Sequence, residues 1–406
     1  MQTVIAEPLK YTPQGAVAEQ LLRACVHCGF CNAVCPTYRL LGDELDGPRG
    51  RIYLIKQTLE TGDADAAGLT HLDRCLTCRS CETACPSGVE YGQLLDIGRE
   101  LMAKPGIRSR RQRWLRRWLV AALAYPRRAA WLIGAARRLK PWLPGFLRAK
   151  LPDRQAAETW PAPRHQRRVL IPQGCLQPAL APRIDAATAR VLDSLGISAV
   201  SLPAGCCGAL PYHLDRQAEG LTMMLETVER CWCELQAGAE AVVSTASGCG
   251  VTLKDYGRLL GDDPDYAAKA AAVAAKTRDI AELLSGEDLS RLAIRTCRVA
   301  VHSPCTLQHG QGLPGIVESL LNGLGFELAT VADADLCCGS AGSYSLLQPA
   351  IAERLRDAKL TTLQAGAADV IVTANIGCWL HLRERATLPV RHWIELLDPG
   401  APGQRR

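Results

Sequence analysis

Residues 166–400 carry two successive series of apolar and polar segments that follow the same order. The first series opens on an apolar strand pattern at residues 168–171 and continues with a helical pattern over residues 186–195. The second series opens on a similar strand pattern at residues 299–302. Because apolar strands alternate with helices in each series, we predict two small repeated α/β domains with parallel strands.

The N-terminal quarter of the chain has a helical pattern instead. A short helix is expected from Ala16, and the apolar positions at residues 52–59 fall on one helical face. Apolar residues continue at helical spacing over residues 94–104. We therefore predict an α+α/β fold class, in which an N-terminal helical domain precedes two small repeated α/β domains.

The length agrees with this division, because 406 residues hold two to four domains at ~150 residues per domain. We place a helical domain at residues 1–104 and a connector at residues 105–165. The first repeat is expected at residues 166–290 and the second at residues 291–406.

The positive charge of the chain is concentrated in one segment. Residues 101–150 contain 14 Lys or Arg and no Asp or Glu, so with a net charge of +6 the rest of the chain carries −8. The segment also holds four of the eight tryptophans, Trp114, Trp118, Trp131 and Trp142. Its longest uncharged run, residues 118–126, is shorter than the ~20 residues of a membrane-spanning helix.

Three interpretations of this basic segment remain open. Arginine, tryptophan and leucine without acidic residues suit a helix at an anionic membrane surface. The same helix could dock on an acidic partner subunit, or the segment could be a solvated linker. We do not expect nucleic acid as a partner, because no binding module accompanies the charge.

Two cysteine motifs at residues 25–36 and 75–86 both fit C-x2-C-x2-C-x3-C-P. This is the spacing of bacterial ferredoxins with two [4Fe–4S] clusters, in which the fourth cysteine of each motif binds the other cluster. The motifs predict one cluster on Cys25, Cys28, Cys31 and Cys85 and a second on Cys75, Cys78, Cys81 and Cys35. The 39 residues between the motifs favour clusters held between helices. Arg49 and Arg51 in this insert either offset cluster charge or are solvated residues at a helix start.

Zinc is the main alternative at paired C-x2-C motifs, but a zinc site has no use for an exchanged fourth cysteine before proline. Residues 1–10 are polar and lack the apolar core of a signal peptide. Without an export signal, a chain with 19 cysteines is expected to bind metal rather than form disulfides. We therefore expect a cytoplasmic protein.

Eight further cysteines recur in the two repeats. They are Cys175, Cys206, Cys207 and Cys249 in the first repeat, and Cys305, Cys337, Cys338 and Cys378 in the second. Corresponding cysteines lie 129 to 131 residues apart, in loops just beyond strand ends, where open α/β sheets keep their sites. One or two further iron–sulfur clusters, a single occupied repeat and zinc are the alternatives. Cys231, Cys233 and Cys297 are expected to be ordinary small apolar residues.

Other motifs do not indicate catalysis on an organic substrate. The G-x-G-x-x-G match at residues 310–315 does not follow its strand directly and contains Pro314, so we expect no dinucleotide site. No catalytic residue is predicted, which leaves one-electron transfer as the chemistry. His302, close to Cys305, is a metal ligand, a hydrogen-bond donor to a ligand, or, as is commoner at a strand end, a hydrogen-bonded core residue.

These motifs together resemble those of the iron–sulfur subunits of bacterial glycolate oxidases (glycolate dehydrogenases). The resemblance runs nearly end to end and is most specific at residues 25–31, 41–56, 75–81, 336–342 and 372–378. It implies a complex with two flavoprotein subunits that carry FAD and oxidise glycolate to glyoxylate. It also implies that electrons leave through this chain toward a membrane quinone, at the cytoplasmic face of the inner membrane.

The repeats also resemble cysteine-rich domains of heterodisulfide reductases and of the electron-transfer subunit of anaerobic glycerol-3-phosphate dehydrogenase. These two families supply the alternative functions. Their last element is usually C-x2-C, whereas Ala246 and Asn375 replace its first cysteine here. The replacements disfavour a five-cysteine noncubane cluster and disulfide reduction, and they leave a four-cysteine site in each repeat.

Overall fold

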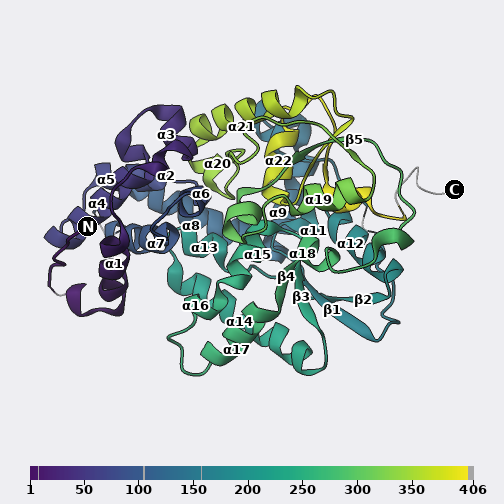
Figure 1. The fold of residues 1–406 in the computed structure, drawn as a ribbon, viewed down its shortest axis with the longest axis horizontal. Coiled ribbons are helices and arrows are strands. Elements are labelled where there is room, and N and C mark those ends of the chain that lie inside the picture. Colours follow the sequence, from purple (N-terminus) through teal and green to yellow (C-terminus); the bar gives the residue numbers. More distant parts are fainter. Residues whose placement is uncertain (8, 104–105, 157, 401–406) are drawn as a thin grey trace. The chain divides into compact units, whose positions relative to one another are not determined.

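The structure is a computed structural model that describes residues 1–400 except residues 8, 104, 105 and 157. It divides into two compact units. Unit 1 comprises Met1–Arg117 and Asp335–Leu355, and unit 2 comprises Trp118–Ala334 and Arg356–Arg406. Lys104, where the sequence predicts a helix end, and the last six residues of the predicted second repeat lie outside the described residues. Figure 1 labels the elements.

Unit 1 is built from helices around the two N-terminal cysteine motifs (Figure 1). Its helices are α1 (Pro13–Ala24), α2 (Phe30–Ala33), α3 (Pro36–Leu41), α4 (Pro48–Thr61), α5 (Ala66–Asp73), α6 (Ser80–Thr83), α7 (Tyr91–Met102) and α20 (Tyr344–Leu347). The expected helix over residues 52–59 lies within α4, which buries Ile52, Ile55 and Leu59. A proline opens α4 and Gly62, with φ of 74°, ends it, as their backbone preferences favour.

Unit 2 contains two sheets of identical topology. The strands of the first are β1 (Arg167–Pro172), β2 (Ile197–Leu202), β3 (Ala241–Ser244) and β4 (Thr277–Asp279), in the order β2-β1-β3-β4. Those of the second are β5 (Arg298–His302), β6 (Glu327–Leu328), β7 (Val370–Thr373) and β8 (Val390–His392), in the order β6-β5-β7-β8. All strand pairs are parallel, so the structure contains the repeated parallel sheets that the sequence predicts.

Helices connect and cover these strands. Those within unit 2 are α9 (Pro126–Arg138), α10 (Gly145–Lys150), α11 (Gln177–Leu180), α12 (Arg183–Ser194), α13 (Ala209–His213), α14 (Gln217–Gln236), α15 (Ser247–Lys254), α16 (Tyr256–Leu259), α17 (Ala267–Lys276), α18 (Ile280–Leu284), α19 (Ile316–Gly323) and α22 (Ile376–Arg383). Two further helices, α8 (Arg110–Leu123) and α21 (Pro349–Gln364), run across the division between the units.

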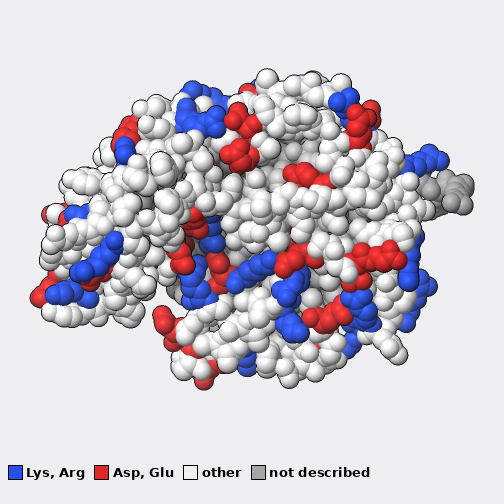
Figure 2. Space-filling model, viewed as in Figure 1, with Lys and Arg blue, Asp and Glu red and all other residues white. Residues whose placement is uncertain are grey.

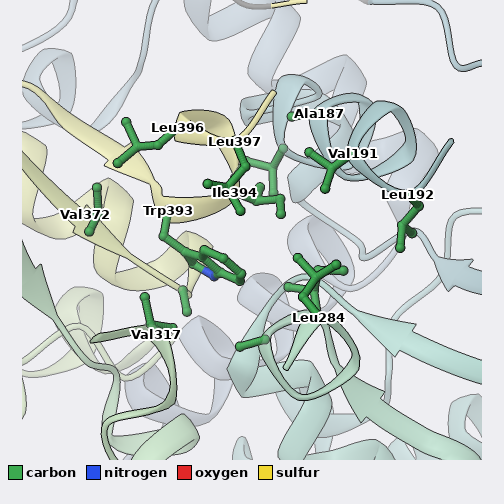
Figure 3. Packing of buried hydrophobic residues seen from close by; sticks show 14 of the residues in the cluster. Ala187, Val191, Leu192, Leu284, Val317, Val372, Trp393, Ile394, Leu396 and Leu397 are labelled. Carbon is green, nitrogen blue, oxygen red and sulfur yellow. The ribbon is translucent and has the colours of Figure 1, made fainter. Parts of the chain in front are cut away.

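The two sheets of unit 2 share one apolar core. Leu192 of α12 and Leu284 of α18 belong to the same buried cluster as Val317 of α19, Val372 of β7 and Trp393, and Figure 3 shows these side chains converging. All residues of β3 and β7 are buried, as expected for parallel strands covered on both faces. The repeats therefore fold as one body and do not form two independent cores.

Charged residues pair along the edges of unit 2. Arg167 at the start of β1 contacts Glu240 at 2.9 Å and Glu287 at 2.7 Å. In the face drawn in Figure 2, basic and acidic side chains lie interspersed. Such exposed pairs contribute little individually, typically ~0–1 kcal/mol.

The basic segment is packed and is not a solvated linker. Helix α9 buries Ala129 and Ile133 in a cluster with Leu180 of α11. The phenol of Tyr125 donates a hydrogen bond of 2.8 Å to Glu219 of α14. The four tryptophans of the segment nevertheless remain between 48% and 86% exposed. Within the described part of the chain, no helix is long and apolar enough to cross a bilayer.

Candidate iron–sulfur sites

The two N-terminal cysteine motifs fold into loops with the same backbone shape. His27 and Thr77, at equivalent positions, adopt positive φ angles of 58° and 52°, and Gly29 and Arg79 adopt 86° and 59°. Each loop then enters a one-turn helix, α2 or α6, that carries the third cysteine. Left-handed backbone costs a residue with a side chain about 1–2 kcal/mol, so the loops retain a shape that local preference disfavours.

Each loop builds a small pocket, and the pocket linings contain the two cysteine sets that the sequence predicts. The first pocket is lined by Cys25, Cys28, Cys31 and Cys85, and also by Cys81. The second is lined by Cys35, Cys75, Cys78 and Cys81. The fourth cysteine of each motif thus lies with the first three of the other motif, and Cys81 borders both pockets.

Burial and thiol crowding raise the pKa of two of these cysteines, Cys31 and Cys81. Burial, followed by the charges of Cys25 and Cys28, raises the pKa of Cys31 to about 11. Burial, followed by Cys78 and Cys75, also raises the pKa of Cys81 well above its ordinary value. Thiolates crowded in this way need a positively charged group among them, and a metal cluster satisfies this need.

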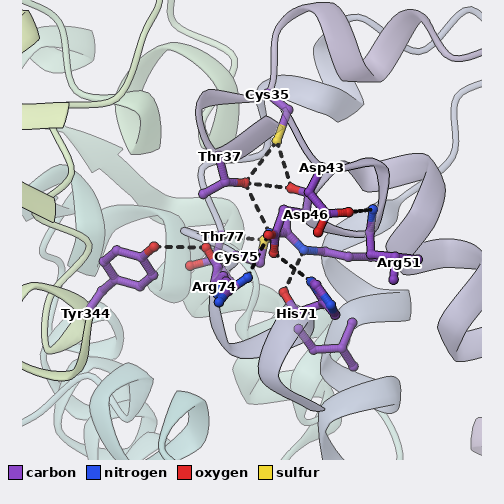
Figure 4. Close-up of polar contacts among 12 residues, drawn as sticks. Cys35, Thr37, Asp43, Asp46, Arg51, His71, Arg74, Cys75, Thr77 and Tyr344 are labelled. Carbon is purple, nitrogen blue, oxygen red and sulfur yellow. Dashed lines mark hydrogen bonds and ion pairs between the residues drawn. The ribbon is translucent and has the colours of Figure 1, made fainter. Parts of the chain in front are cut away.

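Arg51 lines the second pocket, and Figure 4 shows its polar contacts. Its guanidinium is 1% exposed and lies 3.6 Å from the equally buried carboxylate of Asp46. It donates hydrogen bonds to Thr37 Oγ1 at 3.1 Å and to the carbonyl of His71 at 2.8 Å. Thr37 Oγ1 in turn lies 3.3 Å from Cys35 Sγ. The buried arginine therefore fixes a cysteine loop and places a positive charge beside it.

Asp46 has two further partners. His71 Nδ1 lies 2.9 Å and Arg74 Nη1 lies 2.8 Å from its carboxylate oxygens. No local sequence pattern marks Asp46 or His71, because their roles depend on packing of the turn before α4, which carries Asp46, against α5, which carries His71.

Arg49 has a different environment. It is 37% exposed, and its Nε contacts Glu44 at 2.6 Å. A Cβ atom at Gly29 would lie 2.7 Å from Arg49 Nη1, so this guanidinium covers the first cysteine loop. Both arginines therefore lie beside cysteine loops, one buried and one half-exposed.

Tyr91 is a residue of this region that the sequence analysis missed. It opens α7, is 4% exposed and lines both pockets. Pro48, at the start of α4, also lines both. The two pockets therefore share a wall, an arrangement that suits electron exchange between neighbouring clusters.

The four cysteines of the first repeat lie together in unit 2. Their thiols form a hydrogen-bonded series from Cys175 through Cys206 and Cys207 to Cys249. These cysteines follow the carboxyl ends of β1, β2 and β3. In the sheet, β2 lies on one side of β1 and β3 lies on the other, so the strand order reverses between β1 and β3. Open α/β sheets bind ligands at such a switch point. Four convergent sulfur donors fit an iron–sulfur cluster or a zinc ion.

Three thiols of this site, those of Cys175, Cys206 and Cys207, have raised pKa values. The hydrogen bond with Cys175 lowers the pKa of Cys206, but the hydrogen bond with Cys207 and burial outweigh it and raise the value to about 12. Arg230 lines the same pocket as Cys207 and Cys249. Metal binding at this site must therefore release protons.

The glycine of each Cys-Cys-Gly motif has a steric function. Gly208 and Gly339 have φ of 86° and 85°, and a Cβ would lie 2.6 Å from the carbonyl oxygens of Gly220 and Ala352, respectively. The amide of Gly339 donates to Cys337 Sγ at 3.4 Å. Only glycine allows this close approach of the cysteine turns to α14 and α21, respectively.

The cysteines of the second repeat are all buried. Cys305 and Cys378 belong to unit 2, and Cys337 and Cys338 belong to unit 1. Asn375, which replaces the first cysteine of a C-x2-C element, directs its Nδ2 to Cys378 Sγ at 3.8 Å. His302 is also buried, and burial lowers its pKa to about 3, so its imidazole is neutral.

The three cysteines outside the repeat pattern differ from one another. Cys231 is fully buried in the apolar cluster on one side of the first sheet. Cys297 is partly buried against the shared core. Cys233 is exposed, because it lies on the outward side of α14, so it does not pack as the small apolar residue that the sequence analysis expects.

Comparisons with known proteins agree with this arrangement. A family described as "4Fe-4S dicluster domain" matches residues 21–89, and one described as "Cysteine-rich domain" matches residues 169–254 and 299–383. The "Glycolate oxidase iron-sulfur subunit" of Escherichia coli (strain K12) is 51% identical over 98% of both chains. The "Probable glycolate oxidase iron-sulfur subunit" of Bacillus subtilis (strain 168) is 32% identical over 88% of both. "Lactate utilization protein A" of Shouchella clausii is 27% identical over 55% of this chain and 95% of its own.

Proposed function

Because the chain belongs to the family of glycolate oxidase iron–sulfur subunits, we propose that it is the electron-transfer subunit of a complex that oxidises glycolate to glyoxylate. The organic substrate would bind to two flavoprotein subunits that carry FAD. This chain would receive the electrons and pass them toward a membrane quinone. The observation that carries the proposal is the pair of cysteine-lined pockets that share Cys81, Pro48 and Tyr91.

The ligand sets follow from the linings of these pockets. Cys25, Cys28, Cys31 and Cys85 would hold one [4Fe–4S] cluster, and Cys75, Cys78, Cys81 and Cys35 would hold the other. Such clusters accept and release one electron at a time and thereby divide a two-electron oxidation into single steps. Arg51 and Arg49 would offset the negative charge of the thiolates, and the shared wall would keep the two clusters close.

The repeats would provide further metal sites. Cys175, Cys206, Cys207 and Cys249 are joined by hydrogen bonds and would bind an additional iron–sulfur cluster. The matching set of Cys305, Cys337, Cys338 and Cys378 is proposed as a second site on the strength of the repeat. The absence of the C-x2-C cysteine at Ala246 and Asn375 favours electron transfer over disulfide reduction.

The basic segment would attach the complex to the membrane. On α9, Arg127, Trp131 and Arg138 share one exposed side, while Ala129 and Ile133 face the protein. Trp131 is 71% exposed. Exposed tryptophan flanked by arginine suits the interface of an anionic bilayer, where each basic residue contributes about 1 kcal/mol.

Vesicle flotation tests this attachment. We expect the chain to float with phosphatidylglycerol-containing vesicles and not with phosphatidylcholine vesicles, and we expect the double variant Trp118→Ser/Trp131→Ser to bind severalfold more weakly. Tyr53→Ser removes an aromatic side chain that is 53% exposed outside the segment and is the matched control. Equal flotation of the double variant and the control would contradict membrane attachment.

Reconstitution tests the electron-transfer function itself. The flavoprotein partners are assayed for glycolate-dependent reduction of a soluble quinone with this chain, without it, and with Cys81→Ser. We expect full activity only with the parent chain, because Cys81 borders both cluster pockets. Unchanged quinone reduction in the absence of the chain would overturn the proposal.

A further inference from the structure

Unpartnered polar atoms gather at the carboxyl ends of β5 and β7. Among the described residues, neither ring nitrogen of His302 has a hydrogen-bond partner, and the hydroxyls of Ser303 and Thr373 also lack one. His302 is 1% exposed, Ser303 4% and Thr373 0%, and His302 and Thr373 are direct partners in the sheet. Buried polar groups are nearly always paired, so this group of atoms indicates a binding site for something other than the polypeptide.

A sulfur donor lies beside the histidine. One ring nitrogen of His302 is within 4.8 Å of Cys378 Sγ. Nitrogen and sulfur ligands of one tetrahedral metal atom, at their usual bond lengths, are about 3.5 Å apart. A small side-chain rotation therefore suffices to bring both onto one metal atom. The amide of Asn375, which donates to Cys378 Sγ at 3.8 Å, would orient that sulfur, as groups behind a ligand commonly do.

The first repeat has no counterpart of this histidine. His302 precedes Cys305 by three positions, and Pro172 occupies the corresponding position before Cys175. Proline offers no side-chain donor. At this position the first repeat therefore offers no imidazole, whereas the second repeat does.

We propose that His302 and Cys378 bind the same metal atom, iron or zinc, so that the second repeat carries a centre with mixed nitrogen and sulfur coordination. The proposal extends the proposed function, because it gives the second repeat a centre chemically distinct from the all-thiol site of the first. Where the metal is the iron of an iron–sulfur cluster, an imidazole in place of a thiolate raises the reduction potential. The second repeat would then accept electrons more readily than the first.

Metal analysis of purified full-length protein, prepared anaerobically, tests the proposal. His302→Leu retains a similar buried volume but removes the nitrogen ligand, and Cys378→Ser removes the sulfur. We expect both variants to lose the same metal in the same amount. His302→Cys should retain that metal, because a thiolate can replace the imidazole, whereas a histidine that only fills space would give no such rescue.

The control is His165→Leu, which removes a histidine just before β1 whose Nε2 lies 2.9 Å from a carboxylate oxygen of Asp193. It should retain all metal.

In the parent protein, pulsed electron paramagnetic resonance with ¹⁵N-histidine labelling identifies an iron-bound nitrogen, and X-ray absorption at the zinc edge identifies a zinc-bound one. Unchanged metal content in His302→Leu, or no nitrogen ligand by either spectroscopy, would overturn the proposal. The electron paramagnetic resonance signals of the clusters held by the eight N-terminal cysteines should persist in every variant. A loss of metal from the second repeat alone is thereby distinguished from a failure of the electron-transfer function.

Discussion

The phenol of Tyr344 donates a hydrogen bond of 2.9 Å to the backbone carbonyl of Arg74, the residue before Cys75. The two residues are 270 positions apart, and both belong to unit 1. Figure 4 shows the tyrosine reaching the polar network around Arg51 and Asp46. Burial, followed by the charge of Cys75, raises the pKa of Tyr344, which keeps the phenol in its donor form.

Removal of this hydroxyl should loosen the second cysteine loop. We expect Tyr344→Phe to lower the free energy of unfolding by about 1 kcal/mol, the usual net contribution of a hydrogen bond, and to speed amide exchange near residues 74–79. Hydrogen-exchange mass spectrometry measures both effects locally. Tyr53→Phe, at an exposed position of α4, is the control, and equal exchange in the two variants would show that the contact contributes nothing.

Loss of the buried arginine should have a much larger effect. Arg51→Met leaves Asp46 without one of its cationic partners, and breaking a buried pair typically costs about 3–5 kcal/mol. The second cluster should be lost while the first remains, since Thr37 and Cys35 lose their support. Electron paramagnetic resonance spin counting detects this as roughly half of the reduced-cluster signal from the N-terminal unit. Arg49→Met, at a half-exposed position, should cost at most about 1 kcal/mol; similar losses in both variants would contradict the difference in their roles.

A single methyl group should disable the site of the first repeat. Gly208→Ala places a Cβ 2.5 Å from Met224 Cγ and 2.6 Å from the Gly220 carbonyl oxygen, at a φ of 86°. We expect a stability loss of about 2 kcal/mol or more, because a left-handed residue alone costs about 1–2 kcal/mol, and loss of metal from this repeat.

The matched control for that change is Gly174→Ala. Gly174 also adjoins a cysteine of the site, but no atom lies within 4 Å of an added Cβ, so stability and metal content should stay close to those of the parent. Chemical unfolding measures the stability of the two variants, and metal analysis measures their metal content. Parent-like stability and metal content in Gly208→Ala would contradict the prediction and show that the turn accommodates a side chain.

The stability of unit 2 should depend on pH through Asp185. This carboxyl accepts hydrogen bonds from Gln177 at 2.6 Å and Thr245 at 2.7 Å, but burial outweighs them and raises its pKa from 3.8 to about 6. The folded protein therefore holds this proton more tightly than the unfolded chain does. Its contribution to stability is greatest below pH 4 and is lost as the pH rises to about 6.

Asp185→Asn removes this titration. The stability of the variant relative to the parent should rise between pH 4 and pH 7 by up to about 3 kcal/mol, on the scale of ~1.4 kcal/mol per pKa unit. Unfolding in guanidinium at several pH values measures the difference. Burial also raises the pKa of Asp279 to about 6. Because Asp279 titrates in both proteins, its effect on stability cancels from the comparison. A difference independent of pH would contradict the assigned pKa.

The sequence predicted the parts of this molecule that depend on local spacing. The family, the α+α/β fold class and the presence of iron–sulfur clusters are confirmed by the matching families and relatives. The domain boundaries and the individual ligand assignments stay predictions. Spacing succeeds with Cys25 and Cys75 because a C-x2-C loop encodes its own geometry within a few residues.

Roles that depend on packing between distant segments could not be predicted from sequence spacing. Tyr344 and Asp46 are isolated residues of common types, and their roles arise only when distant segments fold together. His302 is an instructive case, since a lone histidine at a strand end is more often hydrogen-bonded than not, yet neither of its ring nitrogens has a partner among the described residues. Its environment, and not its spacing, distinguishes it.

The most direct test of the electron-transfer function is to follow the clusters during turnover. Glycolate is mixed anaerobically with the reconstituted complex, and freeze-quenched samples are examined by electron paramagnetic resonance before and after addition of quinone. We predict that glycolate reduces the N-terminal clusters, that quinone reoxidises them, and that Cys81→Ser abolishes both changes. Quinone reduction at the parent rate while the clusters stay oxidised throughout would contradict the role of this chain as the path for electrons.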